Sequence, residues 1–233
     1  MNMKAKLFTL LFAVVASVGT LFADGGRFGV DGQLTWDYTD GVLTITGNGA
    51  MDTWWESGDA PWDYLSSHII RLDISFSVTT IAPNAFVDCY KLPEVNLPRC
   101  ATSIGEGAFF SCSGMQTLTI EGAVDTIATY AFAWCNGLTA IICKGNTPPH
   151  CHQEAFHGVD RSTPIYVPEK SVDTYKAADV WKEFTNIQAD NNLDIHNTSV
   201  HPSFTVRKQL RNGQVSIQRG NQTYTIFGQE IAE

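Results

Sequence analysis

The densest group of possible metal ligands lies in a segment of eight residues, 150–157. It contains five side chains that zinc accepts as ligands: His150, Cys151, His152, Glu154 and His157. The first three are consecutive, however, and neighbouring residues of an extended chain point to opposite faces. We therefore expect neither a metal nor another cofactor here, and interpret the segment as an irregular turn with a disulfide between Cys143 and Cys151.

Sequence patterns of known catalytic sites are missing. The chain has no H-E-x-x-H, G-x-S-x-G, G-x-x-x-x-G-K-[ST] or C-x-x-C pattern. These spacings position a zinc ion, a nucleophilic serine, a nucleotide phosphate or a redox pair. We therefore expect a protein that is not an enzyme.

Two sets of aromatic residues could bind a ligand without catalysis. In the segment 54–64, four rings lie among three carboxylates: Trp54, Trp55, Trp62 and Tyr64, with Glu56, Asp59 and Asp63. Such a group could be a carbohydrate-binding platform. Alternatively, most of these rings close one end of the fold, which is the interpretation we favour. Trp54 and Trp55 are adjacent and cannot easily both point inward, so one of them should be exposed.

The second set, Phe110, Tyr130 and Trp134, lies close to repeated cysteines. Phe110 and Trp134 occupy equivalent or neighbouring places in successive repeats, so exposed rings would form a contiguous patch of the kind that binds proteins. Both rings could equally pack inward as additional core. Replacing both by Ala should abolish partner binding without unfolding in the first case, and should destabilise the fold in the second.

These residues are positioned by a pattern that occurs three times between residues 81 and 143. The pattern I-x-x-x-A-F-x-x-C recurs every 23 residues and has these members: Ile81, Ala85, Phe86 and Cys89; Ile104, Ala108, Phe109 and Cys112; Ile127, Ala131, Phe132 and Cys135. A fixed period of this length is typical of a solenoid, in which each repeat buries its apolar face only against its neighbours. Function should therefore be sought on the outside of a stack.

Each repeat also contains a short alternating segment: Val95-x-Leu97, Leu118-x-Ile120 and Ile141-x-Cys143. Alternation with period two predicts a strand with one face inward, and stacked repeats would pair such strands in parallel, roughly 4.8 Å apart. The Ala-Phe pairs and the cysteines should form further ladders. We expect buried thiols in the cysteine ladder, because parallel stacked side chains rarely reach disulfide geometry.

The two ends of the stack differ from the repeats. Residues 34–47 alternate between turn residues and predict a β-hairpin. Trp62, which aligns with Ala85 of the first full repeat, would plug the open end. Residues 171–178 predict a short helix with Ser171 as its N-cap.

The N-terminal segment 1–23 predicts a secretory signal peptide, because Lys4 and Lys6 precede an apolar run and a cleavage site could follow Ala23. The run is shorter than a membrane span of roughly 20 residues, so we expect no transmembrane span after signal removal. The chain has a formal net charge of −9, and the signal carries only basic charges. This acidic balance argues against nucleic acid as a partner.

Several segments resemble a known family. The repeat SIGEGAFFSCSGMQTLTI resembles the BspA-like leucine-rich repeat, and IYVPEKSVDTYKAADVWKEFTNI resembles the segment that often closes such arrays. The leader LTWDYTDGVLTITGNGAMDTWW is similar to the hairpin cap before them. The C-terminal RNGQVSIQRGNQTYTIFGQEIAE resembles export and sorting tails of Bacteroidetes proteins. The resemblance implies a cell-surface or secreted binding protein, in some members an adhesin, without catalytic residues.

We therefore predict a β-rich solenoid of the BspA-like leucine-rich-repeat type, with a 23-residue period, a hairpin cap and a short C-terminal helix cap. The expected segments are a signal peptide (1–23), a hairpin and aromatic N-cap (24–60), the solenoid with its C-cap (61–190), a linker (191–203) and a small β tail of three strands (204–233).

The predicted function is adhesin-like binding, on the cell surface or after secretion, to a protein or glycoprotein of the extracellular matrix or of a bacterial surface. The candidate contacts are Phe110, Tyr130, Trp134, Trp54 and Trp55. The alternative is a carbohydrate-binding module that uses residues 54–64.

Overall fold

The computed structural model describes residues 24–54, 56–190 and 193, together with the backbone of four strands between residues 206 and 231. The chain divides into two compact units, Met1–Leu193 and Asp194–Glu233. Trp55 and the signal peptide expected at 1–23 lie outside the described residues. The same holds for the linker expected at 191–203, apart from Leu193.

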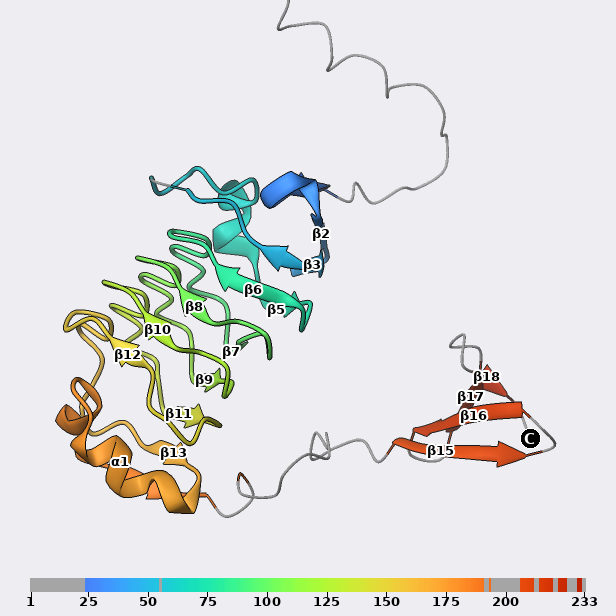
Figure 1. Ribbon diagram of the computed structural model, residues 1–233. Coiled ribbons are helices and arrows are strands. Elements are labelled where there is room, and N and C mark those ends of the chain that lie inside the picture. The colour runs from blue at the N-terminus through green and yellow to red at the C-terminus, as the bar shows by residue number, and fades with distance from the viewer. Residues whose placement is uncertain are drawn as a thin grey trace, which may run out of the picture. The chain divides into compact units, whose positions relative to one another are not determined.

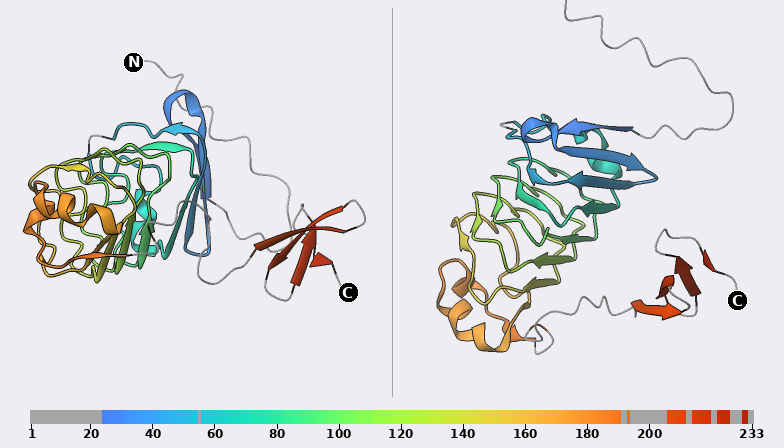
Figure 2. Two further views of the ribbon diagram at one scale, coloured as in Figure 1. Left: turned by 60° about the horizontal axis from the view of Figure 1, so that its bottom comes forward. Right: turned by 45° about the vertical axis from the view of Figure 1, so that its right-hand side comes forward.

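The first unit is a stack of turns with two parallel sheets along its length (Figure 1, Figure 2), ordered β12-β10-β8-β6-β4 and β14-β13-β11-β9-β7. The first sheet contains β4 (Gly49–Ala50), β6 (Val78–Ile81), β8 (Ser103–Ile104), β10 (Thr126–Ile127) and β12 (His150–Cys151). The second contains β7 (Glu94–Asn96), β9 (Thr117–Ile120), β11 (Ala140–Cys143), β13 (Ile165–Val167) and β14 (Ile187–Ala189). Neither sheet closes into a barrel.

The strand register places equivalent residues of successive turns side by side. Ile81 pairs with Ile104 and Ile104 with Ile127, while Leu118 pairs with Ile141 in the other sheet. All five side chains are buried, because alternation along a strand turns every second residue toward the interior. The parallel sheets of a repeat fold therefore form as the sequence predicts.

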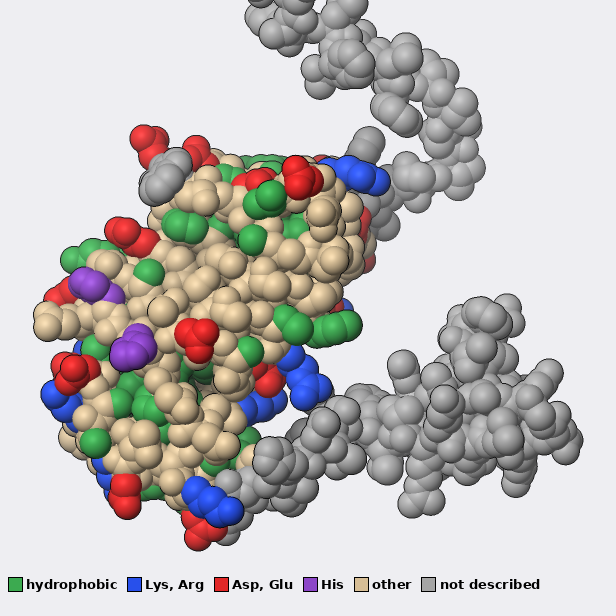
Figure 3. Space-filling view, in the orientation of Figure 1, with side chains coloured by type: hydrophobic (Ala, Val, Ile, Leu, Met, Phe, Trp, Pro, Cys, Tyr) green, Lys and Arg blue, Asp and Glu red, His purple; other side chains and the backbone are tan. Residues whose placement is uncertain are grey.

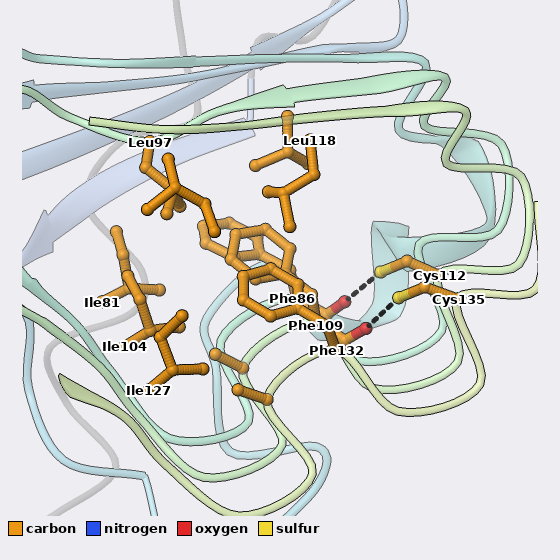
Figure 4. Packing of buried hydrophobic residues seen from close by; sticks show 14 of the residues in the cluster. Ile81, Phe86, Leu97, Ile104, Phe109, Cys112, Leu118, Ile127, Phe132 and Cys135 are labelled. Carbon is orange, nitrogen blue, oxygen red and sulfur yellow. Dashed lines mark hydrogen bonds between the residues drawn. The ribbon is translucent and has the colours of Figure 1, made fainter. Parts of the chain in front are cut away.

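A column of stacked aromatic rings fills the interior between the sheets (Figure 4). Figure 4 shows the rings of Phe86, Phe109 and Phe132 from three successive turns. Phe156 follows in the next turn, and neighbouring ring centroids are 5.0 to 5.4 Å apart. Stacked rings at this distance add an aromatic attraction to the burial of apolar surface. One Phe per turn thus links each turn to the next.

The backbone joins the same turns. The N–H of Phe86 donates to the carbonyl of Ala108 at 2.7 Å, and the N–H of Phe109 donates to the carbonyl of Ala131 at 2.8 Å. Ala85 is the first alanine of this series, and among the described residues no phenylalanine of a preceding turn donates its N–H to the Ala85 carbonyl. There the indole Nε1 of Trp62 donates to the Ala85 carbonyl at 2.7 Å.

The side chain of Trp62 makes contacts that the sequence alignment does not predict. The alignment placed Trp62 on Ala85, but its ring stacks on Phe86 with centroids 5.7 Å apart. The side chain is long enough to extend the aromatic column and to satisfy the Ala85 carbonyl at once. A tryptophan therefore replaces both the ring and the backbone donor of a missing turn.

The cysteines of the repeat form a second interior ladder. The thiol of Cys112 donates to the carbonyl of Phe86 at 3.1 Å, and that of Cys135 donates to the carbonyl of Phe109 at 3.2 Å (Figure 4). A cysteine is small enough for this crowded position and supplies a weak S–H donor. Each thiol thus contacts the backbone of the turn before it.

All six cysteines of the chain are free thiols in the structure, so the disulfide expected between Cys143 and Cys151 is absent from it. Cys143 ends β11 and Cys151 ends β12, and these strands belong to different sheets. The thiol of Cys151 donates to the carbonyl of Pro149 at 3.6 Å, and burial raises its pKa to about 12.

At the N-terminal end, β2 (Leu34–Thr39) pairs antiparallel with both β1 (Asp24–Phe28) and β3 (Val42–Gly47). The other edge of β3 pairs in parallel with β5 (Arg71–Ile74). Two 3-10 helices belong to this region, Val30–Gly32 and Asp63–His68. Phe28 and Trp54 pack against Trp62, with ring centroids 5.0 and 5.3 Å from it. These rings cover the first Phe of the column.

At the C-terminal end, a 3-10 helix (Glu169–Ser171) runs directly into α1 (Val172–Ala177), and a second 3-10 helix (Trp181–Glu183) follows. Ser171 occupies the predicted N-cap position of α1, but its side chain makes no capping hydrogen bond. Because the preceding 3-10 helix already gives it helical backbone angles, its hydroxyl donates instead to Oδ1 of Asn146 at 3.3 Å. Trp181 lies edge-on to Phe156 and ends the column.

The second unit contains a four-stranded antiparallel sheet in the order β15-β16-β17-β18. Its strands are β15 (Val206–Arg211), β16 (Gln214–Arg219), β17 (Gln222–Thr225) and β18 (Glu230–Ile231). The sequence predicted three strands here. The additional one, β18, is only two residues long and carries no alternating pattern that could reveal it.

Candidate functional site

The aromatic segment 54–64 does not form an open platform. Trp54 and Trp62 are 8% and 1% exposed and belong to the ring cluster that covers the N-terminal end. Of the rings described in this segment, only Tyr64 is exposed, at 63%, while Trp55 lies outside the described residues. The expectation that Trp54 contacts a ligand is therefore wrong for this structure, because its ring is used in packing.

The second aromatic set lies on the surface and gains a member. Phe110 and Tyr130 meet edge to face with centroids 6.4 Å apart, and Tyr130 and Trp134 both contact His157, at 6.3 and 5.0 Å. We call Phe110, Tyr130, His157 and Trp134 the aromatic row. Phe110 and Trp134 are connected through Tyr130 and His157. The sequence pattern around His157 indicates only a possible metal ligand.

The row is fixed by hydrogen bonds between turns. The N–H of Trp134 donates to the carbonyl of His157 at 2.7 Å, and the N–H of Asp88 donates to that of Phe110 at 2.9 Å. The N–H of Ser111 likewise donates to the carbonyl of Ala133 at 2.8 Å. Asp88, Ser111 and Trp134 therefore occupy equivalent positions in successive turns. Trp134 thus corresponds to Ser111 and lies one residue beyond the equivalent of Phe110.

The backbone at Tyr130 and Trp134 is left-handed, with φ of +56° and +61°. This region favours Gly, Asn and Asp, and costs a bulky side chain on the order of 1–2 kcal/mol. Preceding turns follow that preference in part: the equivalents of Tyr130 are Asn84 and Gly107, and those of Trp134 are Asp88 and Ser111, all with positive φ. Two large rings therefore occupy positions where the local backbone disfavours them.

Both rings are nevertheless exposed: Tyr130 at 40% and Trp134 at 44%. Burial in the interior does not offset the backbone cost. His157 is also exposed, and its Nδ1 lies 2.7 Å from Oε2 of Glu154. Strain of this kind tends to persist where it serves a function. The row is therefore the candidate binding surface.

Two hollows flank the row. The first, of about 340 Å³, is lined by Phe110 and Tyr130 together with Ser57, Asn84, Val87, Asp88, Glu106 and Gly107. The second, of about 840 Å³, is lined by His157 and several charged side chains. There Arg161 pairs with Glu183 at 3.2 Å and Lys182 pairs with Asp179 at 2.6 Å.

On the face shown in Figure 3, hydrophobic and acidic side chains are interspersed, and histidines lie on the side of β12. Within the residues that the structure describes, no three His, Cys, Asp or Glu side chains are grouped so that they could hold a metal ion.

A family model for the BspA type leucine rich repeat region matches residues 64–178 in six copies. The match includes all three full repeats recognised in the sequence and every member of the aromatic row. Residues 64–178 are therefore similar to a BspA-type leucine-rich repeat region. The strained aromatic residues are thus variations on a surface position within a leucine-rich repeat.

Two solved structures of leucine-rich repeat proteins resemble the chain. A leucine-rich repeat protein from Eubacterium ventriosum ATCC 27560 is 19% identical, with a TM-score of 0.47, and the match covers 87% of this chain and 49% of that protein. A leucine rich cell surface protein from Faecalibacterium prausnitzii A2-165 is 19% identical, with a TM-score of 0.31, and the match covers 89% and 62%. The chain thus spans about half the length of the first of these proteins. No curated protein matches it.

The BspA-type repeat region contains strands and short helices. In the part of the chain that the structure describes, no helix has the length and apolar character needed to cross a membrane.

Proposed function

We propose that the chain is a non-catalytic, adhesin-like protein, secreted or held at the cell surface, that binds a protein or glycoprotein partner through the aromatic row. The observation that carries this proposal is the pair of exposed rings on left-handed backbone, Tyr130 and Trp134. A residue that serves only packing would be buried, and a residue that serves only the turn would be Gly, Asn or Asp.

The chemistry of the row suits protein recognition. Tyr and Trp are enriched among the residues that dominate the binding energy of interfaces, because they combine a large apolar surface with a polar tip. The row is also preorganised by hydrogen bonds between turns, which lowers the entropy lost on binding. A small surface of this kind gains strength when several copies act together.

The remaining parts of the chain fit this role as support. We infer that the N-terminal strands with Trp54 and Trp62, and the C-terminal helix with Trp181, act as caps that shield the ends of the stack. We further infer a signal peptide at 1–23 for export, and a sorting function for the tail at 204–233.

A binding experiment tests the proposal. The full chain is applied to an array of extracellular matrix glycoproteins and bacterial surface proteins, each present intact and after enzymatic deglycosylation. Binding that survives deglycosylation supports recognition of a protein surface. Binding that is lost on deglycosylation would assign the site to a sugar.

The matched variant combines Tyr130→Asn with Trp134→Asp. Both replacements use residue types found at the equivalent positions, Asn84 and Asp88, and both favour the left-handed backbone. We expect this variant to remain folded and to lose binding, whereas Phe76→Ser, at another exposed ring, should bind as before. If the double variant bound as strongly as the wild type and the Phe76→Ser variant, the aromatic row would be excluded as the site.

A further inference from the structure

We propose that the smaller hollow beside the aromatic row accepts an arginine side chain of the partner. This inference rests on the proposed function and specifies the chemistry of the partner. The hollow lies between Phe110 and Tyr130, and we call it the acidic aromatic pocket. It is lined by residues of three successive turns and by Ser57.

The size of the pocket fits a side chain. Its volume of about 340 Å³ lies at the lower end of the roughly 300–1,000 Å³ found for small-molecule sites. The walls combine Val87 with the rings of Phe110 and Tyr130. Such a space can enclose the apolar stem of one long residue, with its polar end at the rim.

The charge of the pocket selects a cation. Asp88 and Glu106 line it, and no Lys, Arg or His does. Neither carboxylate forms an ion pair or a side-chain hydrogen bond with any other residue that the structure describes. By contrast, the carboxylates of Glu154, Asp179 and Glu183 in the second hollow pair with His157, Lys182 and Arg161, respectively. The acidic aromatic pocket therefore offers two exposed carboxylates, without an ion-pair partner among the described residues, beside aromatic rings.

The main chain that carries both acidic residues is bonded to the neighbouring turn. The N–H of Asp88 donates to the carbonyl of Phe110 at 2.9 Å, and the N–H of Asn84 donates to the carbonyl of Glu106 at 2.9 Å. These bonds tie adjacent turns together on both sides of the pocket. A ligand would thus meet a site that needs little reorganisation.

Arginine matches this combination better than lysine. Its planar guanidinium stacks on aromatic rings, pairs with carboxylates through two hydrogen bonds and is more weakly hydrated than an ammonium group. The same arrangement already occurs within this molecule. The guanidinium of Arg161 lies 4.7 Å from the ring centroid of Phe184 while it pairs with Glu183 at 3.2 Å.

The test uses a random library of twelve-residue peptides displayed on phage. The library is selected on the full chain and depleted on the Tyr130→Asn variant, so that the retained peptides depend on the row but are not chosen for charge. We expect arginine to be enriched among them. Replacing that arginine by citrulline, which has the same shape without the charge, should weaken binding about tenfold or more, and lysine should fall between.

The matching change on the protein is Asp88→Asn with Glu106→Gln. Asn tolerates the left-handed backbone at position 88, and Gln has the shape of Glu, so the fold should be unaffected. We expect the double variant to bind the arginine peptide about tenfold more weakly, and to bind the citrulline peptide as well as the wild type does.

The outcomes separate the two proposals. Peptides that require Tyr130 but do not distinguish arginine from citrulline would overturn the arginine inference and leave the proposed function standing. If all peptides enriched on the wild type before depletion bound the Tyr130→Asn and Trp134→Asp double variant equally well, both proposals would be overturned. A selection that enriches no peptide dependent on Tyr130 would also overturn the inference.

Discussion

The indole ring of Trp134 lies directly against the α-carbon of Gly158 in the next turn. A methyl group added at Gly158 would come within 2.7 Å of Cε3 of Trp134, and Gly158 has a φ of +78°. The absence of a side chain at Gly158 therefore makes room for the exposed ring of its neighbour. Gly158 is thus the left-handed residue of the last turn, and it supports Trp134, the left-handed residue at the equivalent position of the turn before.

Gly158→Ala should lower the free energy of unfolding by about 2–3 kcal/mol, because it adds a left-handed backbone cost to a clash with the ring. Urea denaturation followed by circular dichroism measures this change. In a Trp134→Gly background the same substitution should cost only about 1 kcal/mol, since the clash is gone. Equal costs in the two backgrounds would show that the ring does not rest on Gly158.

Tyr130→Asn should leave the free energy of unfolding unchanged or raise it by up to about 1 kcal/mol. Relief of the left-handed backbone outweighs the loss of edge contacts to Phe110 and His157 by a ring that is 40% exposed. The same variant should bind the partner less well. Thermal unfolding and the array measurement check the two halves of the prediction, and a loss of stability above 1 kcal/mol would instead identify Tyr130 as a core residue.

The interior of the repeat region could be predicted because it obeys simple rules. A repeated alternation places Leu118 and Ile120 inward, and the recurrence of one Phe per turn implies a stacked column. The exposed rings obey no such rule. Their left-handed backbone is one that Tyr and Trp disfavour. The sequence gives only an indirect signal of it: Asn84 and Gly107 occupy the positions equivalent to Tyr130 in the preceding turns, and residues of these types indicate a left-handed turn.

The ends were harder to predict than the middle. Trp62 aligns with Ala85 in the sequence, but the alignment does not reveal that its side chain extends the aromatic column and supplies a contact that backbone atoms make elsewhere. Ser171 occupies the N-cap position of α1, as its residue type predicts, yet its side chain makes no capping hydrogen bond because the preceding 3-10 helix gives it helical backbone angles. In both cases a tertiary contact determined the outcome, and residue type alone did not reveal it.

Trp62→Phe should lower the free energy of unfolding by about 1–3 kcal/mol, because the Ala85 carbonyl loses its buried donor while a ring remains in the column. Trp62→Ala should cost more, about 3–5 kcal/mol, because it removes the ring as well. Urea denaturation distinguishes the two. Replacement of the exposed Tyr64 by Phe, in the same segment, serves as the control and should change stability by less than about 0.5 kcal/mol. If Trp62→Phe were equally neutral, the indole N–H would not stand in for the missing turn.

Alkaline pH should destabilise the repeat region through its buried thiols. Burial, together with the neighbouring Cys135 and Cys89, raises the pKa of Cys112 well above its usual value, and burial also raises the pKa of Cys143 and, to about 12, that of Cys151. In the unfolded chain these thiols ionise near pH 8.5. The stability that they contribute is therefore fully present below about pH 8.5 and is lost as the pH rises toward the folded pKa values, because only the unfolded chain releases protons in that range.

Under reducing conditions, each such thiol should lower the free energy of unfolding by about 1.4 kcal/mol per pH unit above pH 9. Urea denaturation between pH 8 and pH 10 measures the slope. Cys112→Ala should remove one thiol's share of it, although the variant is less stable at every pH because the Phe86 carbonyl loses its thiol donor. Cys100→Ala removes an exposed thiol and should leave the slope unchanged. If Cys112→Ala retained the full wild-type slope, the Cys112 thiol would be ionising in the folded chain as readily as in the unfolded one, and the cysteine ladder would not be sealed from water.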